Sequence, residues 1–426
     1  MNTQMITTIF LTVLALRYIV LVWLNIRNIR HISLHSNSVP DHFTDLISIE
    51  NHKKTARYSI SRIKAVIFFS AYDQIILLLW TLGGGIEQIH LLTNTISSSY
   101  FINGTCFFAV LLVISTIVAI PQSIWSTFVI EEQYGFNNTT KKLFIIDLCK
   151  GLVVSGAIGL PLIAGIIFIM EKLGSLWWVW AWIFMNIFQL FLLILYPRVI
   201  APLFNKFITL PDGEIKKRIK ELLKRTGFKA RGLFIMDASK RSRHGNAYFT
   251  GFGKEKRIVF FDTLVEKLIP SEIEAVLAHE LGHYKKKHVI KKMAALVIFS
   301  LFAFYILGLL YTWPVFYHGH GSEYQTTWIA LALFIFISTP YTFFVTPIQA
   351  WFSRRHEFEA DDFAARFSNA SDLINSLKKM YRDNASTLTP DPLFSRFYYS
   401  HPPAVERIKN LMKHIGDNHN ETDCRN

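Results

Sequence analysis

The sequence predicts an all-α integral membrane protein with seven transmembrane helices and a small cytosolic region that carries a short β-hairpin. Of its 426 residues 51% are hydrophobic, and the mean hydropathy of +0.29 is too high for an ordinary soluble protein of this charge. Seven apolar segments of about twenty residues are each long enough to cross a bilayer. They lie near residues 6–25, 64–83, 105–125, 148–170, 175–196, 293–313 and 327–348.

The first segment has neither the basic leader nor the Ala-x-Ala-like cleavage site of a signal peptide, so we expect it to stay as a membrane anchor. Spans one to five form one region, residues 1–197. The second region, residues 198–426, holds a basic cytosolic stretch, spans six and seven, and the C-terminal segment.

The formal net charge of +14 follows membrane topology rather than nucleic-acid binding. Lysines and arginines cluster after span one, between spans five and six, and after span seven, whereas residues 84–104 and 314–326 contain none. The positive-inside rule places the basic loops in the cytosol and the N-terminus outside. We therefore expect membrane lipid, and no nucleic acid, as a partner.

Two charged residues lie inside predicted spans. Arg17 is near the middle of span one, and Asp73 lies at a similar depth in span two. An intramembrane charge is costly and usually faces a partner or a water-filled interior. The sequence favours an inward-facing Arg17–Asp73 pair, with an arginine that extends to the interface as the alternative.

The cytosolic stretch between spans five and six combines a helix and a hairpin. Residues 214–226 have the apolar spacing of an amphipathic surface helix. Aromatic and β-branched runs at Asn246–Phe252 and Arg257–Phe261 flank a turn at Gly253–Lys256. The edge of such a hairpin could accept an extended peptide as an added strand, although a purely structural hairpin is the alternative.

A helical zinc-protease signature, His-Glu-x-x-His, follows the hairpin. His279 and His283 are four residues apart on one helical face, so both imidazoles could bind one metal ion. Glu280 points about 100° away, towards a water beside the metal. Pro270, with Ser271 and Glu274 as a capping box, is expected to start this helix. Two surface histidines four apart by chance are the alternative.

The signature helix is expected to run straight into span six, with His283 about 15 Å from the hydrocarbon edge. Span seven, bent at Pro340 and Pro347, returns to the same membrane face and leads into an acidic cluster. A catalytic zinc needs a third protein ligand, and that cluster offers Glu357, Glu359 and Asp361.

Spacing alone does not choose among these three acids, and a solvated acidic face is the alternative. Glu357 and Asp361 share one helical face, which would allow one to bind the metal while the other orients a ligand histidine.

With these motifs in place, the chain resembles the type 1 CAAX prenyl protease family over nearly its whole length. The matching blocks are Ser126–Glu132, Gly135–Asn137, Ile200–Phe204, Ser239–Ser242, Asn246–Phe249, Phe261–Leu264, His279–His283, Glu357–Asp361, Ser400–Pro403 and Glu406–Arg407.

The resemblance implies seven spans around an aqueous chamber, one Zn²⁺ per chain, and cleavage of proteins prenylated at a C-terminal cysteine. It makes His279, His283 and Glu357 the zinc ligands, Glu280 the general base and Asp361 the acid that orients a ligand. Asn246 and Arg407 become substrate-binding residues, and His401 a donor to the oxyanion.

Two competing functions stay open. One is a membrane quality-control zinc protease without a prenyl requirement, and the other an inactive seven-helix transporter or receptor, which the intact Glu280 and ligand set disfavour. The lean cytosolic insertions favour a bacterial cell membrane, with the endoplasmic reticulum membrane as the eukaryotic alternative.

Overall fold

Seven helical segments in the computed structural model, which describes residues 2–250 and 256–423, are long and apolar enough to span a membrane. They are Thr3–Leu34, Ile49–Trp80, Tyr100–Tyr134, Lys141–Lys172, Gly174–Phe204, His288–Tyr311 and Thr327–Phe367. Each overlaps one segment predicted from the sequence, so the seven-span architecture is confirmed. The aqueous chamber that the resemblance implies stays a prediction.

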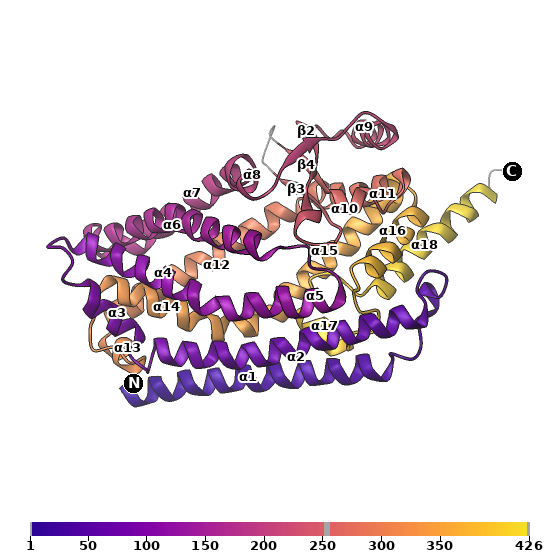
Figure 1. Ribbon diagram of the computed structural model, residues 1–426. Coiled ribbons are helices and arrows are strands. Elements are labelled where there is room, and N and C mark those ends of the chain that lie inside the picture. The colour runs from indigo at the N-terminus through magenta and orange to yellow at the C-terminus, as the bar shows by residue number, and fades with distance from the viewer. Residues whose placement is uncertain (1, 251–255, 424–426) are drawn as a thin grey trace.

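Four spans are single helices and three are interrupted by 3-10 or π-helical turns (Figure 1). The single helices are α1 (Thr3–Leu34), α2 (Ile49–Trp80), α6 (Lys141–Lys172) and α12 (His288–Tyr311). Span three comprises α4 (Tyr100–Ile124), the π-helix η2 (Trp125–Glu131) and α5 (Glu132–Tyr134), and span five comprises η3 (Gly174–Leu176), α7 (Trp177–Leu195), η4 (Tyr196–Ile200) and α8 (Ala201–Phe204). Span six is α12 (His288–Tyr311), which follows a turn, and span seven comprises α14 (Thr327–Thr342), η7 (Phe343–Val345) and α15 (Thr346–Phe367).

Span seven lies deepest in the bundle and bends near both prolines, as expected. Pro340 is inside α14 and Pro347 is in the first turn of α15, on either side of η7. In the 18-residue apolar stretch of this span 44% of the residues are buried, compared with 6% to 22% in the corresponding stretches of the other six spans. Span seven therefore carries the acidic cluster from the middle of the bundle to the membrane face.

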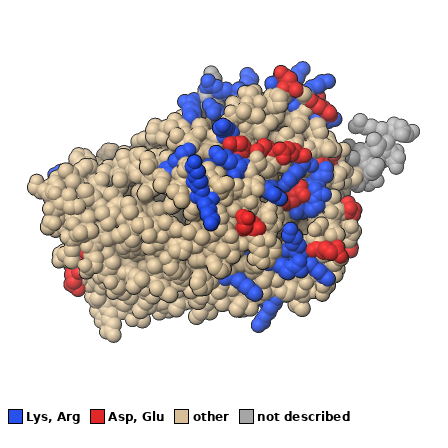
Figure 2. All heavy atoms as spheres, in the orientation of Figure 1, with Lys and Arg blue, Asp and Glu red and all other residues tan. Residues whose placement is uncertain are grey.

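Charged side chains gather at one end of the molecule. Figure 2 shows them over the half that holds the sheet and the helices around it, while most of the other half is tan. At the far end lie the short helices α3 (Gly85–Thr93) and α13 (Pro314–Gly319) (Figure 1). This distribution fits the cytosolic and external ends inferred from the lysine and arginine pattern.

The predicted hairpin is half of a larger, mixed sheet. Its strands β3 (Ala247–Thr250) and β4 (Arg257–Phe261) pair antiparallel, and β4 also pairs in parallel with β2 (Gly232–Met236). With β1 (Phe207–Thr209), the order is β1-β2-β4-β3, which leaves β3 at an edge. The tip of the hairpin, residues 251–255 with Gly253 of the predicted turn, lies outside the described residues.

Five further helices share a hydrophobic core with this sheet, namely α9 (Glu214–Thr226), α10 (Asp262–Val265), α11 (Pro270–Lys285), α16 (Ala370–Asp383) and α18 (Ala404–Asp423). Helix α17 (Pro392–Tyr398) packs instead against α15 and α1. Two short 3-10 turns are η1 (Asp41–Phe43) and η5 (Ala238–Lys240). Helix α9 is the predicted amphipathic helix, and its Ile219 and Leu222 are fully buried. They share a core with Phe260 of β4 and with Ile273 and Leu277 of α11. A separate core around Trp328 of α14 fills the opposite end.

The signature helix does not continue into span six as expected. Helix α11 ends at Lys285, and Lys287 adopts a left-handed conformation with φ of 57° before α12 begins at His288. This conformation is strained for a residue with a side chain. The distance of about 15 Å deduced from a straight helix therefore does not apply.

The expected capping box is also wrong. The Glu272 carboxylate, rather than that of Glu274, accepts a hydrogen bond of 3.1 Å from the backbone N–H of Ile269, one residue before the helix starts at Pro270. Glu274 instead forms ion pairs with Arg218 and Arg225 of α9. Glu274 therefore forms a tertiary contact with α9 instead of capping its own helix.

Arg17 and Asp73, expected as an inward-facing pair, do interact electrostatically, but no hydrogen bond or ion pair within 4.0 Å joins them in the described structure. The Arg17 guanidinium lies 5.9 Å from the centre of the Phe343 ring, and its Nε is buried without a hydrogen-bond partner. Arg17 thus contacts η7, the break in span seven. A cation over an aromatic face gains part of the stabilisation that a carboxylate would have supplied.

We predict that the two ends of the bundle lie on opposite sides of the membrane. In a cysteine-free background, Glu323→Cys, beside α13, should react with a membrane-impermeant maleimide added to intact cells. Asp212→Cys, ahead of α9, should react only after lysis. The two side chains are 81% and 91% exposed, so access to the reagent alone decides labelling. Labelling of Asp212→Cys in intact cells would show that this topology is wrong.

Candidate active site

The metal-binding residues come together because α11 and α15 approach very closely. A Cβ added at Gly282 would lie 2.9 Å from Cα and 3.0 Å from the carbonyl oxygen of Ala360. Only glycine permits this approach without a shift of one backbone. Ala278, Ala360 and Ala364 at the same contact have no exposed surface. The acidic cluster of span seven is therefore pressed against the signature helix.

His279, His283 and Glu357 form one three-donor group, with one ligand atom of each within 4.8 Å of the others. The Nε2 atoms of the two histidines are 3.2 Å apart. Glu357 places Oε2 3.4 Å from His279 Nε2 and Oε1 3.2 Å from His283 Nε2. Among the described residues this is the metal-binding group that the geometry identifies.

The donors fit zinc. Two imidazoles and one carboxylate are a ligand set of catalytic zinc sites, with a fourth position left for water or substrate. Glu357 is 2% exposed, and its Oε2 has no hydrogen-bond partner of acceptable geometry, although His401 Nδ1 lies 2.7 Å away. A buried carboxylate oxygen without a hydrogen bond is costly unless a cation occupies the space before it.

Asp361 and Arg407 hold His279 from behind. Asp361 Oδ1 lies 2.8 Å from His279 Nδ1, and Arg407 donates to both Asp361 oxygens at 2.6 and 2.8 Å. Burial and the Arg407 charge lower the pKa of His279, but Asp361 and Glu357 outweigh them and raise it to about 9, so a metal ion at Nε2 has to displace a proton from the imidazolium. With the Nδ1 hydrogen directed at Asp361, Nε2 faces the metal group, and its lone pair becomes available once that proton leaves. Arg407 is 6% exposed, so it lies behind the metal group rather than towards a substrate.

A second chain of contacts, not foreseen from the sequence, orients His283. His283 Nδ1 lies 3.0 Å from His288 Nδ1, and His288 Nε2 lies 3.1 Å from Glu359 Oε2. A carboxylate only accepts, so His288 donates through Nε2 and accepts through Nδ1. His283 then donates from Nδ1 and directs its Nε2 lone pair at the metal group. Histidines five apart carry no familiar spacing signal, because the break at Lys287 brings them together.

Glu280 is placed differently from its neighbours. It is the one residue between Glu272 and Gly282 that is not buried. In the described part of the chain, no hydrogen bond or ion pair engages its carboxylate. A carboxylate that follows a metal ligand in the chain and has no protein partner is available to accept a proton from water.

Asn246 and His401 are both exposed. Asn246 precedes edge strand β3, and its Oδ1 accepts a hydrogen bond of 2.8 Å from the N–H of Ala247. The side chain of His401, in the turn before α18, is 62% exposed. The structure thus brings His279, His283, Glu357, Asp361, Arg407 and His401 into direct contact, while Asn246 lies apart from them at the sheet edge.

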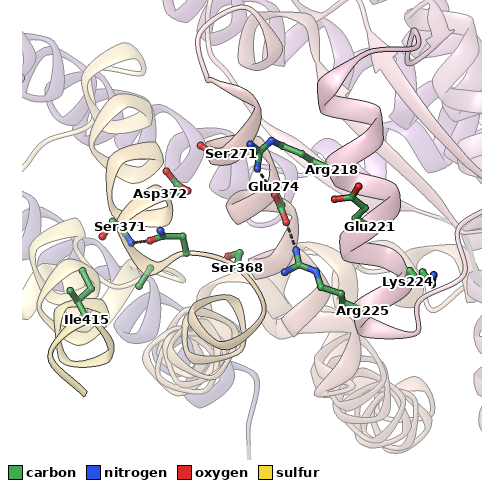
Figure 3. A pocket seen from close by; sticks show the side chains of 12 residues that line it. Arg218, Glu221, Lys224, Arg225, Ser271, Glu274, Ser368, Ser371, Asp372 and Ile415 are labelled. Carbon is green, nitrogen blue, oxygen red and sulfur yellow. Dashed lines mark hydrogen bonds and ion pairs between the residues drawn. The ribbon is translucent and has the colours of Figure 1, made fainter. Parts of the chain in front are cut away.

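A cavity of about 1110 Å³ lies between α9, α11 and α16, away from the metal group (Figure 3). Figure 3 shows Arg218 and Arg225 both pointing at Glu274 in its wall. These ion pairs join α9 to the signature helix. The cavity holds no residue of the metal group, and we assign it no catalytic role.

Comparison with known proteins agrees with this arrangement. Residues 28–206 match the family described as "CAAX prenyl protease N-terminal, five membrane helices", and residues 209–415 match "Peptidase family M48". The "CAAX prenyl protease 1 homolog" of Arabidopsis thaliana is 35% identical over 413 residues, 92% of this chain and 94% of its own. The "CAAX prenyl protease 1" of Saccharomyces cerevisiae is 33% identical, with 89% of each chain covered.

The crystal structure of S. mikatae Ste24p matches the fold with a TM-score of 0.88 at 33% identity, covering 96% of this chain and 99% of that chain. Fold, metal group and relatives agree on an integral membrane zinc metalloprotease. Within that class, this chain belongs to the CAAX prenyl protease 1 family of M48 peptidases. The resemblance seen in the sequence blocks is thereby confirmed.

The metal group predicts distinct outcomes for two neighbouring acids. Glu357→Ala should lose zinc and activity because it removes a ligand. Glu359→Ala should keep zinc in the purified protein, with affinity lowered about tenfold because His283 loses the support of His288. Metal analysis and chelator competition measure both effects. Zinc loss in Glu359→Ala together with zinc retention in Glu357→Ala would refute the assignment of the third ligand.

Proposed function

We propose that this chain cleaves membrane-tethered polypeptides at the cytosolic face, removing the three C-terminal residues of proteins that end in a prenylated Cys-aliphatic-aliphatic-X sequence. The position of the metal group carries the proposal. His283 touches His288, the first residue of span six, so the site lies directly against a transmembrane helix. The names of the relatives, CAAX prenyl protease 1, support the substrate class.

The chain's own residues divide the chemistry among them. His279, His283 and Glu357 would hold a zinc ion, which would supply Lewis acidity and make a water more acidic. Glu280 takes a proton from the attacking water and returns it to the departing amine. His401 donates a hydrogen bond to the substrate oxygen that gains negative charge. Asp361 and Arg407 keep His279 aligned, which replaces the direct substrate contact expected for Arg407.

The edge of β3 offers a binding mode for the peptide. The backbone N–H of Phe261 donates to the carbonyl of Asn246, and the antiparallel register pairs Tyr248 with Val259. In an antiparallel pair the residues between, Ala247 and Phe249, direct their backbone groups to the free edge. An extended substrate would bind there as a fifth strand, next to Asn246.

The cellular placement we propose is the cytosolic face of the endoplasmic reticulum membrane. The relatives described above come from a plant and a fungus and give no support to the bacterial cell membrane favoured from the sequence. The basic end of the molecule, which holds the sheet and the metal group, supports the cytosolic orientation (Figure 2).

The role of Glu280 predicts a separation of metal binding from turnover. Glu280→Gln should retain zinc at the wild-type level, because Glu280 lies outside the three-donor group. Its kcat should fall roughly 10²- to 10⁴-fold, since no other side chain takes the proton. Glu266→Gln, an exposed acid just before α11, is the matched control and should keep full activity. Wild-type turnover by Glu280→Gln would refute the assignment.

Tethering predicts a dependence on lipid position. Each methylene of a lipid chain buried in the membrane contributes about 0.8 kcal/mol, and an untethered peptide lacks that contribution. A farnesylated peptide should therefore be cleaved with much higher kcat/KM than its unprenylated twin or one with the cysteine moved ten residues upstream. Equal cleavage rates for these three peptides would favour the quality-control function.

Binding at the edge of β3 makes a separate prediction. Proline at the positions flanking the cut should block cleavage, because strand addition needs their N–H groups.

A further inference from the structure

A cavity of about 570 Å³ begins at His401 and extends between α1 and α2. His401 itself contacts Glu357, so this cavity opens directly beside the metal group. Leu21, Ile32 and Ile63 give it a largely apolar wall from the two helices. Its volume lies within the roughly 300–1000 Å³ of small-ligand pockets. The site therefore adjoins an apolar compartment of the size of a short peptide.

The sheet edge determines which end of a bound peptide faces this cavity. Asn384, in the cavity wall, accepts from the N–H of Gly245 at 2.9 Å and donates to its carbonyl at 3.2 Å. The cavity therefore lies next to the N-terminal end of β3. A peptide added antiparallel to β3, the commoner orientation, runs with its C-terminus towards Gly245 and thus towards the cavity. The residues beyond the cleaved bond enter it.

One wall residue is a cation without a close carboxylate partner among the described residues. The cavity is lined by Arg62 of α2, and in the described part of the chain no carboxylate lies within 4.0 Å of its guanidinium. The guanidinium lies 5.5 Å from the centre of the Tyr58 ring. Tyr58 donates a hydrogen bond of 2.6 Å to Glu131, whose other oxygen lies 3.3 Å from His244 Nε2. The Arg62 side chain also interacts with the Tyr58 hydroxyl and, beyond 4.0 Å, with the charge of Glu131, so these contacts position its guanidinium over the ring in the cavity wall.

The turn that forms another part of the wall is conformationally strained. Ala385, next to Asn384, has a φ of 44°, in the left-handed region that residues with a Cβ rarely adopt. Strain of this kind persists where the surrounding structure enforces it, often at binding sites. Asn384 anchors this turn to Gly245, so the cavity wall and the peptide-binding edge have a fixed relative position.

We propose that Arg62 binds the C-terminal carboxylate of the substrate and thereby places the cut a fixed number of residues from the chain end. A planar guanidinium pairs with a carboxylate through two parallel hydrogen bonds. Three extended residues span about 10 Å, and the apolar wall suits their aliphatic side chains. The proposal rests on the function proposed above, and it adds a specificity-determining residue that acts at the far end of the departing tripeptide.

The test compares two farnesylated peptides that differ only at the C-terminus, one with a free carboxylate and one with an amide. For wild type, kcat/KM should be higher for the acid. In Arg62→Gln the acid-to-amide ratio should fall about 10- to 100-fold, the range of a charge-assisted hydrogen bond. Arg62→Lys, which keeps the charge but not the planar pair of donors, should give an intermediate ratio. Arg57→Gln, an exposed residue of α2 outside the cavity, should keep the wild-type ratio.

Zinc content and thermal unfolding, measured on each variant, report whether the fold is intact, and Arg62→Lys remains a test if Arg62→Gln does not fold. Equal wild-type rates on acid and amide would overturn carboxylate recognition while leaving the proposed protease function standing. A wild-type ratio in a folded Arg62→Gln would overturn the choice of residue. Failure of the wild-type enzyme to cleave either farnesylated peptide would overturn the proposed function itself.

Discussion

The close approach of α11 and α15 at Gly282 and Ala360 is the contact on which the site depends. Helix α11 precedes span six in the chain and α15 follows it, yet their backbones approach so closely that a Cβ at position 282 would clash with Ala360. A side chain at position 282 would separate them, and Glu357 would then withdraw from the two histidines. Packed interiors transmit such shifts rather than absorb them, so a single methyl group here acts directly on metal geometry.

This contact buries charges that a soluble surface would leave in water. Asp361 is fully buried, and Glu357, His279 and Arg407 are each no more than 6% exposed. Taking such groups out of water costs more than their mutual attraction commonly returns, unless the geometry is good and the remaining donors are satisfied. Here the fold satisfies all of them except one Glu357 oxygen, which faces the other metal ligands. The arrangement therefore fits a cation better than it fits a structural ion-pair network.

Local spacing predicted the parts of the site that are local. His279, Glu280 and His283 follow from the period of one helix, and the seven spans follow from length and apolarity. The third ligand did not follow, because Glu357, Glu359 and Asp361 lie on one turn of helix and differ only in what other elements bring near them. In the structure Glu357 meets both histidines, Asp361 meets His279 and Arg407, and Glu359 meets His288.

The errors have the same origin. A lysine run is a good helix former, so nothing local signalled the left-handed Lys287 that ends α11. The pattern at Ser271 and Glu274 is a valid cap locally, but Glu274 gains more from Arg218 and Arg225. Strands β1 and β2, of three and five residues, are too short to show alternation in the sequence, and pairing with neighbouring strands stabilises them.

The protease region is also not a soluble module attached to an anchor. Asp147 of α6 forms a two-bond pair with Arg241, and Glu131 at the end of span three meets His244, both just before β3. Asn384 holds Gly245 from the other side. The edge strand is thus positioned by two transmembrane segments and the C-terminal segment together. Any change in the packing of the bundle would move that edge relative to the metal ligands, which links membrane architecture to the register of the cut.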